Sequence, residues 1–362
     1  MTEKCVALLG RRDHPTDAVE EYCRYLGEAL RPHGFEAELA RVNWAEMGWP
    51  AALSGLRKKA CDWRGQWILL QYTALAWSKR GFPVGFLAVV HLLRHRGARV
   101  AVVYHDVDAY PGGRGVHNVR RSVQLGTMRR ALVASELAVL TVPLEKVGWL
   151  PPHHSRAVFI PVGANLPPQA IGNANDSLHQ PPGVAVFGIT GGDAGHEETQ
   201  AIISAVQLAA EKIGTLRLKV FGRHADLREG ALREAFRDLR VQLEISGILS
   251  GEGIARELAA SDVLLFARGP ISSRRGSAVA GIACGLPVIA YSGSETAPPI
   301  TEAGVVLVSR DNRHEAAEAL VRVLTDRPYH DALVRSSRAA YERYFSWPAI
   351  AARYAEALRP RS

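Results

Sequence analysis

The sequence has few cysteines and no long apolar run. The wide spacing of the four cysteines, with no CxxC pair, argues against a zinc site and against a disulfide framework, and it is typical of a protein of the reducing cytoplasm. A catalytic thiol is the alternative left open. The longest apolar stretch, 81–93, is shorter than the roughly 20 residues of a membrane-spanning helix, so we expect a buried helix there. The first ten residues show no signal-peptide pattern. The cysteines are Cys5, Cys23, Cys61 and Cys284.

Acidic residues are scarce in the first half of the chain. Residues 1–165 contain 22 Lys and Arg against 14 Asp and Glu, whereas residues 166–362 contain 22 of each, so the net charge of +8 comes from the first half. Such a one-sided charge attracts phosphates, acidic glycans, an anionic membrane surface or nucleic acid; solvated helix faces are the alternative. No nucleic-acid-binding motif accompanies the charge, so we expect no nucleic-acid partner. We expect a cytoplasmic protein, with attachment to the inner face of the membrane left open.

Short apolar segments alternate with helical patterns along most of the chain. This alternation is typical of a parallel sheet covered by helices on both faces. It predicts an α/β fold with two Rossmann-like, doubly wound domains. The predicted strands are 5–10, 35–40, 67–72, 99–105, 137–142, 157–163, 184–189, 216–222, 241–247, 262–267, 287–291 and 304–309. The predicted helices include 17–31, 196–213, 227–240, 251–260, 276–284 and 313–325.

A segment rich in Pro, Asn and Gly interrupts the alternation near the middle of the chain. We therefore predict an N-terminal domain over 1–165, a linker over 166–183 and a C-terminal domain over 184–346. The tail contains two helical pieces interrupted at "FSWP". We expect the second piece, 347–362, to run back across the first domain. Ligands of doubly wound sheets bind outside the carboxyl ends of the strands, so the expected site is the cleft between two facing domains.

The segment 272–290, "SSRRGSAVAGIACGLPVIA", predicts a helix entrance that favours an anion. Free backbone N–H groups and the helix dipole attract negative charge there. Hydroxyl and guanidinium groups add donors that suit phosphate, and glycine allows close approach of the backbone. A plain helix cap with solvated arginines is the alternative. The predicted phosphate-binding residues are Ser272, Ser273, Arg274, Arg275, Gly276 and Ser277.

A glycine-rich turn follows the first strand of the second domain. Its sequence, "FGITGGDAGHEE" (187–198), matches neither GxGxxG nor a Walker A motif. We expect it to form a second wall of the same anion site through Gly188, Thr190, Gly191 and Gly192. Arg223 follows another strand, where its guanidinium plane can stack on a nucleobase; a surface loop arginine is the alternative.

In the first domain, "VVYHDVDAYPGGRG" (102–115) places His105 and Asp106 at the end of a predicted strand. We predict His105 and Asp106 as the catalytic residues, since a histidine in that position can hydrogen-bond a sugar hydroxyl or transfer a proton. The alternative is a histidine that only satisfies a loop carbonyl. Asp106 and Asp108 lack a further ligand cluster, so we predict no metal site.

Several motifs together resemble retaining GT-B glycosyltransferases of the group 1 type. The matching segments occur in the family's order: "YHD" (104–106), "FIPVGAN" (159–165), "DVLLFA" (262–267), "ACGLPVIA" (283–290) and "FSWPAIAARYAEAL" (345–358). The resemblance implies a GT-B fold and transfer of a sugar from a nucleotide-diphosphate sugar to an acceptor, with retention, without a metal and without a further cofactor. The partners it implies are that donor and a glycan, lipid-linked or small-molecule acceptor.

The chain departs from the family pattern at the implied donor site. Ser272 and Ala280 occupy the positions where the family usually has two glutamates, and "ITGGDAGH" (189–196) replaces its usual Arg and Lys. These departures leave two further functions open. One is a glycosyltransferase-like binding or partner subunit without catalysis, and the other is a sugar-nucleotide epimerase of the GT-B fold. The sequence identifies neither sugar, base, acceptor nor oligomeric state.

Overall fold

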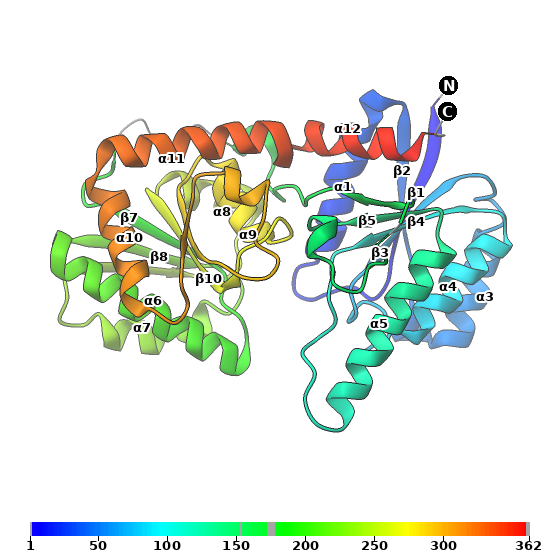
Figure 1. Cartoon of the computed structure of the whole chain (residues 1–362), viewed down its shortest axis with the longest axis horizontal. Helices are drawn as coiled ribbons and strands as arrows, with labels where there is room; N and C mark the ends of the chain where they lie inside the picture. The colour runs from blue at the N-terminus through cyan, green and yellow to red at the C-terminus, as the bar shows by residue number, and fades with distance from the viewer. Residues whose placement is uncertain (1, 153, 172–177, 360–362) are drawn as a thin grey trace. The chain divides into compact units, whose positions relative to one another are not determined.

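A computed structural model describes residues 2–152, 154–171 and 178–359, and divides the chain into two compact units (Figure 1). The first unit holds the chain up to Pro161 together with the segment from Trp347 onward, and the second unit holds Val162–Ser346. The boundary lies four residues before the predicted domain end at 165. It does so because the Val162 N–H donates to the Ser273 carbonyl (3.1 Å) and attaches this segment to the second unit. Residues 172–177 of the predicted linker and 360–362 of the predicted tail helix lie outside the described residues.

The first unit is built on a parallel six-stranded sheet with the order β2-β1-β3-β4-β5-β6. The order reverses between β1 and β3, which makes their carboxyl ends the switch point of this sheet. All six residues of β3 are buried, as expected for a strand covered on both faces. The strands are β1 (Glu3–Leu9), β2 (Phe35–Arg41), β3 (Trp67–Tyr72), β4 (Arg99–Tyr104), β5 (Leu137–Leu140) and β6 (Ala157–Phe159).

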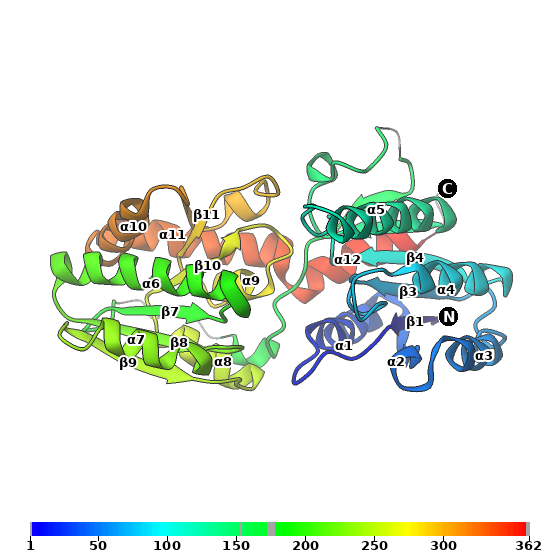
Figure 2. The ribbon, with the colours of Figure 1, turned by 90° about the horizontal axis from the view of Figure 1, so that it is seen from below.

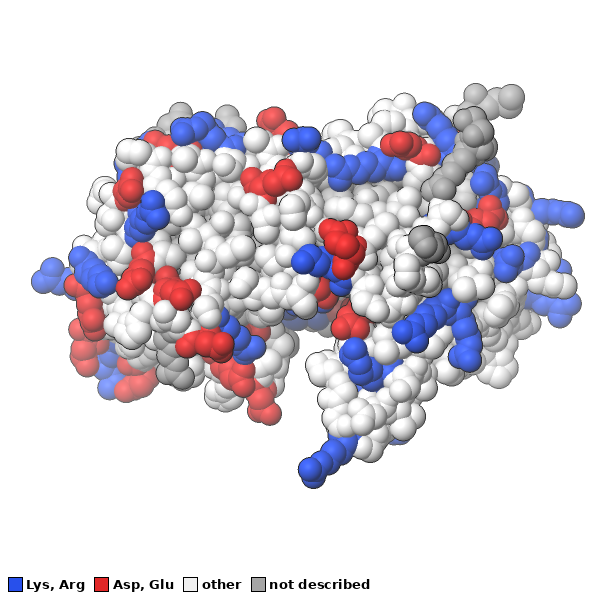
Figure 3. Space-filling model, in the orientation of Figure 1, with Lys and Arg blue, Asp and Glu red and all other residues white. Residues whose placement is uncertain are grey.

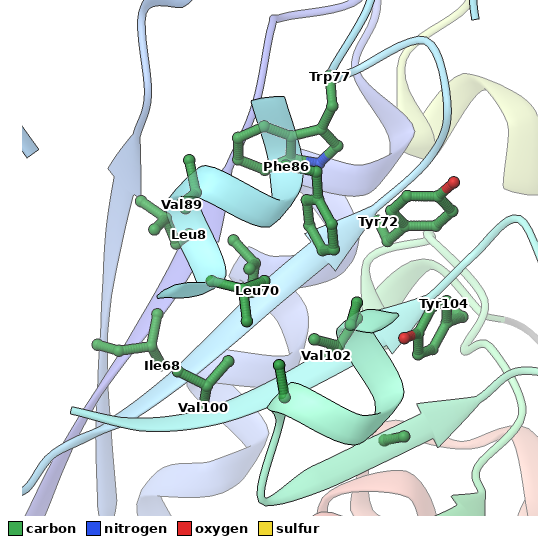
Figure 4. Packing of buried hydrophobic residues seen from close by; sticks show 14 of the residues in the cluster. Leu8, Ile68, Leu70, Tyr72, Trp77, Phe86, Val89, Val100, Val102 and Tyr104 are labelled. Carbon is green, nitrogen blue, oxygen red and sulfur yellow. The ribbon is translucent and has the colours of Figure 1, made fainter. Parts of the chain in front are cut away.

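Helices form two groups around this sheet. Alternate strand residues, among them Leu8, Leu70 and Val102, share one buried cluster with α3, α4 and α5 (Figure 4). The opposite face of the sheet is covered by α1 and α12, which pack against each other. The Trp67 indole N–H of β3 donates to the Leu358 carbonyl of α12 at 2.8 Å. The helices are α1 (Ala18–Leu30), α2 (Trp44–Met47), α3 (Trp49–Lys59), α4 (Val84–His95), α5 (Val116–Ala134) and α12 (Trp347–Leu358).

The second unit has a parallel sheet with the order β12-β11-β10-β7-β8-β9 (Figure 2). This is the Rossmann order, and its switch point lies between β7 and β10. The strands are β7 (Gly183–Phe187), β8 (Leu216–Phe221), β9 (Val241–Ser246), β10 (Val263–Pro270), β11 (Val288–Tyr291) and β12 (Val305–Val308). The helices are α6 (Gly192–Ile213), α7 (Glu229–Ala235), α8 (Gly251–Ala259), α9 (Gly276–Ala283), α10 (Arg313–Thr325) and α11 (Arg327–Ala340).

The observed elements confirm the predicted fold class. Each of the twelve predicted strands is present, with ends that differ by a few residues. The apolar stretch 81–93 forms most of α4, which is buried on one face only, since Val84 is 61% exposed. The helix predicted over 227–240 is shorter, since α7 covers only Glu229–Ala235. The first tail piece is a π-helical turn, Tyr341–Phe345, that continues α11, and α12 begins at Trp347. In the described part of the chain, no helix is long and apolar enough to cross a bilayer.

Candidate anion site at the switch point of the second unit

The turn after β7 brings the predicted glycines together in front of α6. Gly188 has a left-handed φ of 77°, and its N–H donates to the Phe221 carbonyl at 2.7 Å. The Thr190 N–H donates to the Glu198 carboxylate at 2.7 Å, which ties the turn to the second turn of α6. A Cβ at Gly195 would lie 1.8 Å from the Thr190 oxygen, so only glycine fits there. The helix entrance at Gly192 therefore offers backbone N–H groups to an anion at the switch point.

The end of β8 lies against this turn. The Arg223 carbonyl accepts a hydrogen bond from the Ile189 N–H at 3.0 Å. His224 has a left-handed φ of 63°, and its ring lies next to Gly191, where a Cβ would meet Nε2 at 3.3 Å. A side chain at Gly191 would thus press on the imidazole. The structure brings Arg223 to the same edge of the sheet as the glycine turn.

The residues predicted at the second helix entrance differ in their exposure to solvent. Ser272 and Ser273 are buried, and Gly276 and Ser277 open α9 with Gly276 exposed. The Ser272 hydroxyl donates to Glu295 at 3.1 Å. The Ser272 hydroxyl therefore already has a protein acceptor. As the sequence predicts, α9 ends before Gly285, which has a left-handed φ of 76°.

Glu295 pairs with Arg274 in a two-pronged salt bridge. Arg274 Nε lies 2.7 Å from Glu295 Oε2, and Arg274 Nη2 lies 3.0 Å from Oε1. Burial works against ionisation of the carboxyl. The hydrogen bond and charge of Arg274, the Ser272 hydroxyl and the charge of Arg275 outweigh burial and hold the pKa of Glu295 below its usual value. The charge of Arg274 is thereby largely neutralised. Sequence reasoning missed Glu295, whose only signal was an acid in the loop that follows β11.

Arg275 and Arg268 form no salt bridge within the described residues, unlike Arg274. Arg275 Nε is buried and has no hydrogen-bond partner in the described chain. Burial, together with the charge of Arg274, lowers the pKa of Arg275 to about 10, so the guanidinium stays protonated at neutral pH. Arg268, at the carboxyl end of β10, lies against the glycine turn, where its Nη1 would be 3.2 Å from a Cβ at Gly188. Its side chain makes no hydrogen bond or ion pair within the described residues.

Burial lowers the pKa of Arg268, and the charge of Arg223 adds to that effect while Glu198 opposes it. Arg268 therefore lies near enough to both Arg223 and Arg275 for their like charges to interact. The carboxylate of Glu198 opposes the effect at Arg268, and Glu198 and Glu295 both oppose it at Arg275. Positive charge held at this density, beside two helix entrances, suits a multiply charged anion such as a diphosphate. Sequence reasoning missed Arg268. Its signal was a charged residue inside the apolar run of β10.

His105 and Asp106 lie in the first unit, at the carboxyl end of β4. His105 Nε2 lies 2.8 Å from Gln71 Oε1, and the ring packs edge-on against Tyr22 at 5.0 Å. Burial lowers the pKa of His105 to about 4, so the imidazole is neutral at pH 7. Asp106 Oδ2 accepts from the Ala74 N–H at 2.8 Å and holds the loop that follows β3. His105 has the geometry of a hydrogen-bonding group, and Asp106 that of a loop anchor.

Comparisons with known proteins agree with this architecture. Residues 186–326 match the family model "Glycosyl transferases group 1". No curated protein matches the sequence. Sucrose-phosphate synthase from Thermosynechococcus elongatus has a similar structure, with 17% identity, a TM-score of 0.71 and 98% of both chains covered. Anabaena HepE in complex with UDP and glucose has 14% identity and a TM-score of 0.64, with 98% of this chain and 99% of HepE covered.

A third neighbour is a putative UDP-N-acetylglucosamine 2-epimerase from Listeria monocytogenes, at 12% identity and a TM-score of 0.64, with 98% of this chain and 95% of that one covered. Likeness at such low identity shows the fold. The chain has the two-domain GT-B fold, and its second unit carries the region that matches the group 1 glycosyl transferases.

Proposed function

We propose that the protein transfers a sugar from a nucleotide-diphosphate sugar to an acceptor hydroxyl, with retention and without a bound metal. In this reaction the bond between the sugar C1 and the diphosphate oxygen breaks, and a bond from C1 to the acceptor oxygen forms. The acceptor proton leaves with the diphosphate or the solvent. The proposal assigns the donor to the second unit and the acceptor to the first.

The observation that carries the proposal is the pair Arg268 and Arg275 at the β7/β10 switch point. Each charge-assisted hydrogen bond to a phosphate contributes about 1.5–3 kcal/mol, and charge growing on the leaving diphosphate strengthens such bonds in the transition state. The match of residues 186–326 to a glycosyl transferase family and the UDP bound to HepE support the same assignment. We propose that Gly188, Thr190, Gly191 and Gly192 supply the turn around the phosphates.

Glu295 also bears on the departure from the family pattern at Ser272. Its carboxylate lies 3.1 Å from the hydroxyl of Ser272, the residue at the position where the family usually has a glutamate, and comes from a different segment of the chain. Ala280, at the second of these positions, is buried in α9. We propose that Ser273, Gly276, Ser277 and Arg223 complete the donor site, and that His105 acts on the transferred sugar.

A panel of nucleotides tests this function. Isothermal titration with UDP, GDP and ADP, each beside its monophosphate, is expected to show one diphosphate that binds at least tenfold more tightly than its monophosphate. The matching sugar nucleotides are then incubated with the protein, with and without EDTA. Slow hydrolysis that EDTA leaves unchanged supports the proposal. A changed sugar without an acceptor would identify an epimerase. No diphosphate binding at all would overturn the proposal, and binding without turnover would favour the non-catalytic subunit.

The positive charge of the first unit supports an anionic acceptor or an anionic membrane surface as its partner. The cytoplasmic location and the peripheral membrane contact stay predictions. Co-sedimentation with vesicles of neutral and anionic lipid tests the membrane contact, and equal binding to both would remove it.

A further inference from the structure

We infer that the first unit holds a binding site for an anionic amphiphile, a molecule with an apolar chain and a phosphate-type head. The site is a pocket of about 340 Å³ that lies among α2, α3 and the start of α4. Its lining is mainly aromatic. Trp49 and Phe82 are half-buried, whereas Trp44 and Trp77 are buried and belong to the core of this unit. This volume lies within the range of small-molecule sites. The assignment of this ligand as the acceptor rests on the proposed function.

The aromatic wall is held open by specific contacts. Trp44 and Trp49 stack with ring centroids 5.1 Å apart and an interplanar angle of 7°. The Trp44 indole N–H donates to the Ala76 carbonyl at 2.8 Å, which fixes the inner ring. A Cβ at Gly85 would lie 2.2 Å from the Trp49 ring, so only glycine lets that ring lie against the start of α4. The pocket is therefore formed before any ligand arrives.

The pocket opens to solvent beside two cations. Lys79 and Arg80 line it and are exposed, and in the described part of the chain neither side chain makes a hydrogen bond or ion pair. Val84, 61% exposed, adds an apolar group. No acidic side chain lines the pocket. An apolar wall beside unpaired positive charge matches an apolar chain that carries an anion.

The chemistry of the lining argues against a carbohydrate. The lining has few side-chain groups for sugar hydroxyls, because it contains no carboxylate or amide and only one hydroxyl, that of Ser78. Ser78 Oγ already accepts the Phe82 N–H at 2.8 Å. A bare phosphate would leave the aromatic wall in water. A ligand with an apolar chain and an anionic head would contact both the aromatic lining and the two cations.

The wider charge pattern and the place of the pocket in the fold point the same way. Residues 47–135 contain 14 Lys and Arg against three Asp and Glu. Figure 3 shows this part of the first unit, over α3–α5, with many blue and few red side chains. The pocket also lies at the carboxyl edge of the sheet, as His105 does. The Trp77 indole N–H donates to the Gln71 carbonyl at 2.8 Å, and the Gln71 side chain holds His105. An amphiphile in this pocket therefore binds at the sheet edge where we place the proposed chemistry.

Titration of the whole protein with dodecyl phosphate below its aggregation concentration tests the site, with tryptophan fluorescence and calorimetry as readouts. We expect saturable binding of dodecyl phosphate. Dodecyltrimethylammonium, which has the same chain and a positive head, is expected to bind with at least tenfold lower affinity. Inorganic phosphate at millimolar concentration is expected not to compete. Equal binding of both amphiphiles, or competition by phosphate alone, would overturn the inference.

Val84→Asp places a negative charge at the pocket and is expected to weaken dodecyl phosphate binding at least tenfold. Its control is Val133→Asp, at a valine on α5 that is 72% exposed and lies outside the pocket, which is expected to change nothing. The double variant Lys79→Ala/Arg80→Ala is expected to weaken binding as well, whereas Arg57→Ala/Lys58→Ala on α3 is not. Equal effects of the two aspartates would overturn the pocket assignment.

Vesicles with and without anionic lipid separate a single bound molecule from a bilayer surface. Binding to anionic vesicles but not to monomeric dodecyl phosphate would overturn the pocket in favour of a membrane surface. Nucleotide binding at the second unit is measured separately. If it fails while dodecyl phosphate still binds, the proposed function falls and the amphiphile site stands without its role as acceptor site.

Discussion

His105 Nε2 lies 2.8 Å from Gln71 Oε1, and this contact determines which nitrogen of the imidazole carries the proton. The Gln71 amide N–H₂ donates to the Leu69 carbonyl at 2.9 Å, and a carbonyl can only accept. The amide oxygen must therefore face His105, so Nε2 carries the hydrogen. Nδ1 is left with its lone pair and has no hydrogen-bond partner within the described chain. A neutral imidazole with a free Nδ1 is suited to accept a hydrogen bond from a sugar hydroxyl.

Burial of His105 makes stability depend on pH. Its pKa is about 4 in the folded protein and about 6.5 in the unfolded chain, so the unfolded state binds more protons between these values. Stability is therefore expected to fall as pH drops from about 6.5 towards 4, by up to about 3 kcal/mol. Urea unfolding of the wild type and His105→Asn at a series of pH values measures this. The variant should lose that part of the pH dependence, and identical profiles would contradict the prediction.

Gln71→Glu is expected to raise the pKa of His105, because a carboxylate beside Nε2 favours the protonated ring. Titration of the histidine by NMR measures the change and also reports the tautomer of the wild type. Gln71→Leu, which removes the hydrogen bond without adding charge, serves as the control. A proton on Nδ1 in the wild type would show that Gln71 does not orient the ring.

Arg268→Ala and Arg275→Ala are each expected to weaken nucleotide diphosphate binding about tenfold or more, since each removes charged hydrogen bonds to phosphate. Arg274→Ala is expected to have a smaller effect, because Glu295 already neutralises that guanidinium. Calorimetry at two salt concentrations measures both affinity and its electrostatic part. Arg233→Ala, an exposed arginine on α7, is the control. Equal affinities for all four variants would remove Arg268 and Arg275 from the site.

Glu295→Gln is expected to destabilise the second unit by about 2 kcal/mol, because Arg274 loses its ionic partner in a mostly buried setting. The pKa of Glu295 is lowered in the folded state, so its contribution is present above pH 4.5 and is lost as pH falls below that value. Thermal unfolding at pH 7 and at pH 3 should therefore show a larger difference from the wild type at pH 7. The control is Glu252→Gln, at an exposed residue of α8, which is expected to leave the stability unchanged at both pH values.

Tyr22 and Tyr354 join α1 to α12 through their hydroxyl groups, which lie 2.8 Å apart and are buried. Tyr354→Phe leaves the Tyr22 hydroxyl without this partner and should cost about 1–2 kcal/mol of stability. The double variant Tyr22→Phe/Tyr354→Phe removes both polar groups, so its loss should be smaller than the sum of the two single losses. Denaturant unfolding of the three variants gives the coupling. Strict additivity would show that the contact contributes nothing.

Local patterns in the sequence were sufficient for the fold. Apolar runs marked the central strands because a strand covered on both faces must be apolar along its length, as β3 is. The edge strands β2 and β9 instead alternate polar and apolar residues. The glycine turn at 188–192 and the end of α9 at Gly285 were also predictable, because left-handed backbone and close approach both require glycine. These signals lie within a few residues of the feature that they predict.

The charges of the candidate site depended on tertiary contacts. Glu295 lies 21 residues from Arg274 and forms a salt bridge with it. We therefore assign the proposed phosphate contacts to Arg268 and Arg275 instead of Arg274. Gln71 lies 34 residues from His105 and selects its tautomer. The aromatic pocket joins residues from α2, α3 and the loop before α4. The sequence by itself determined which elements form and which residue types follow the strands. Only the packing of distant segments decided which of those side chains have partners, because burial and pairing depend on neighbours that are not adjacent in the chain.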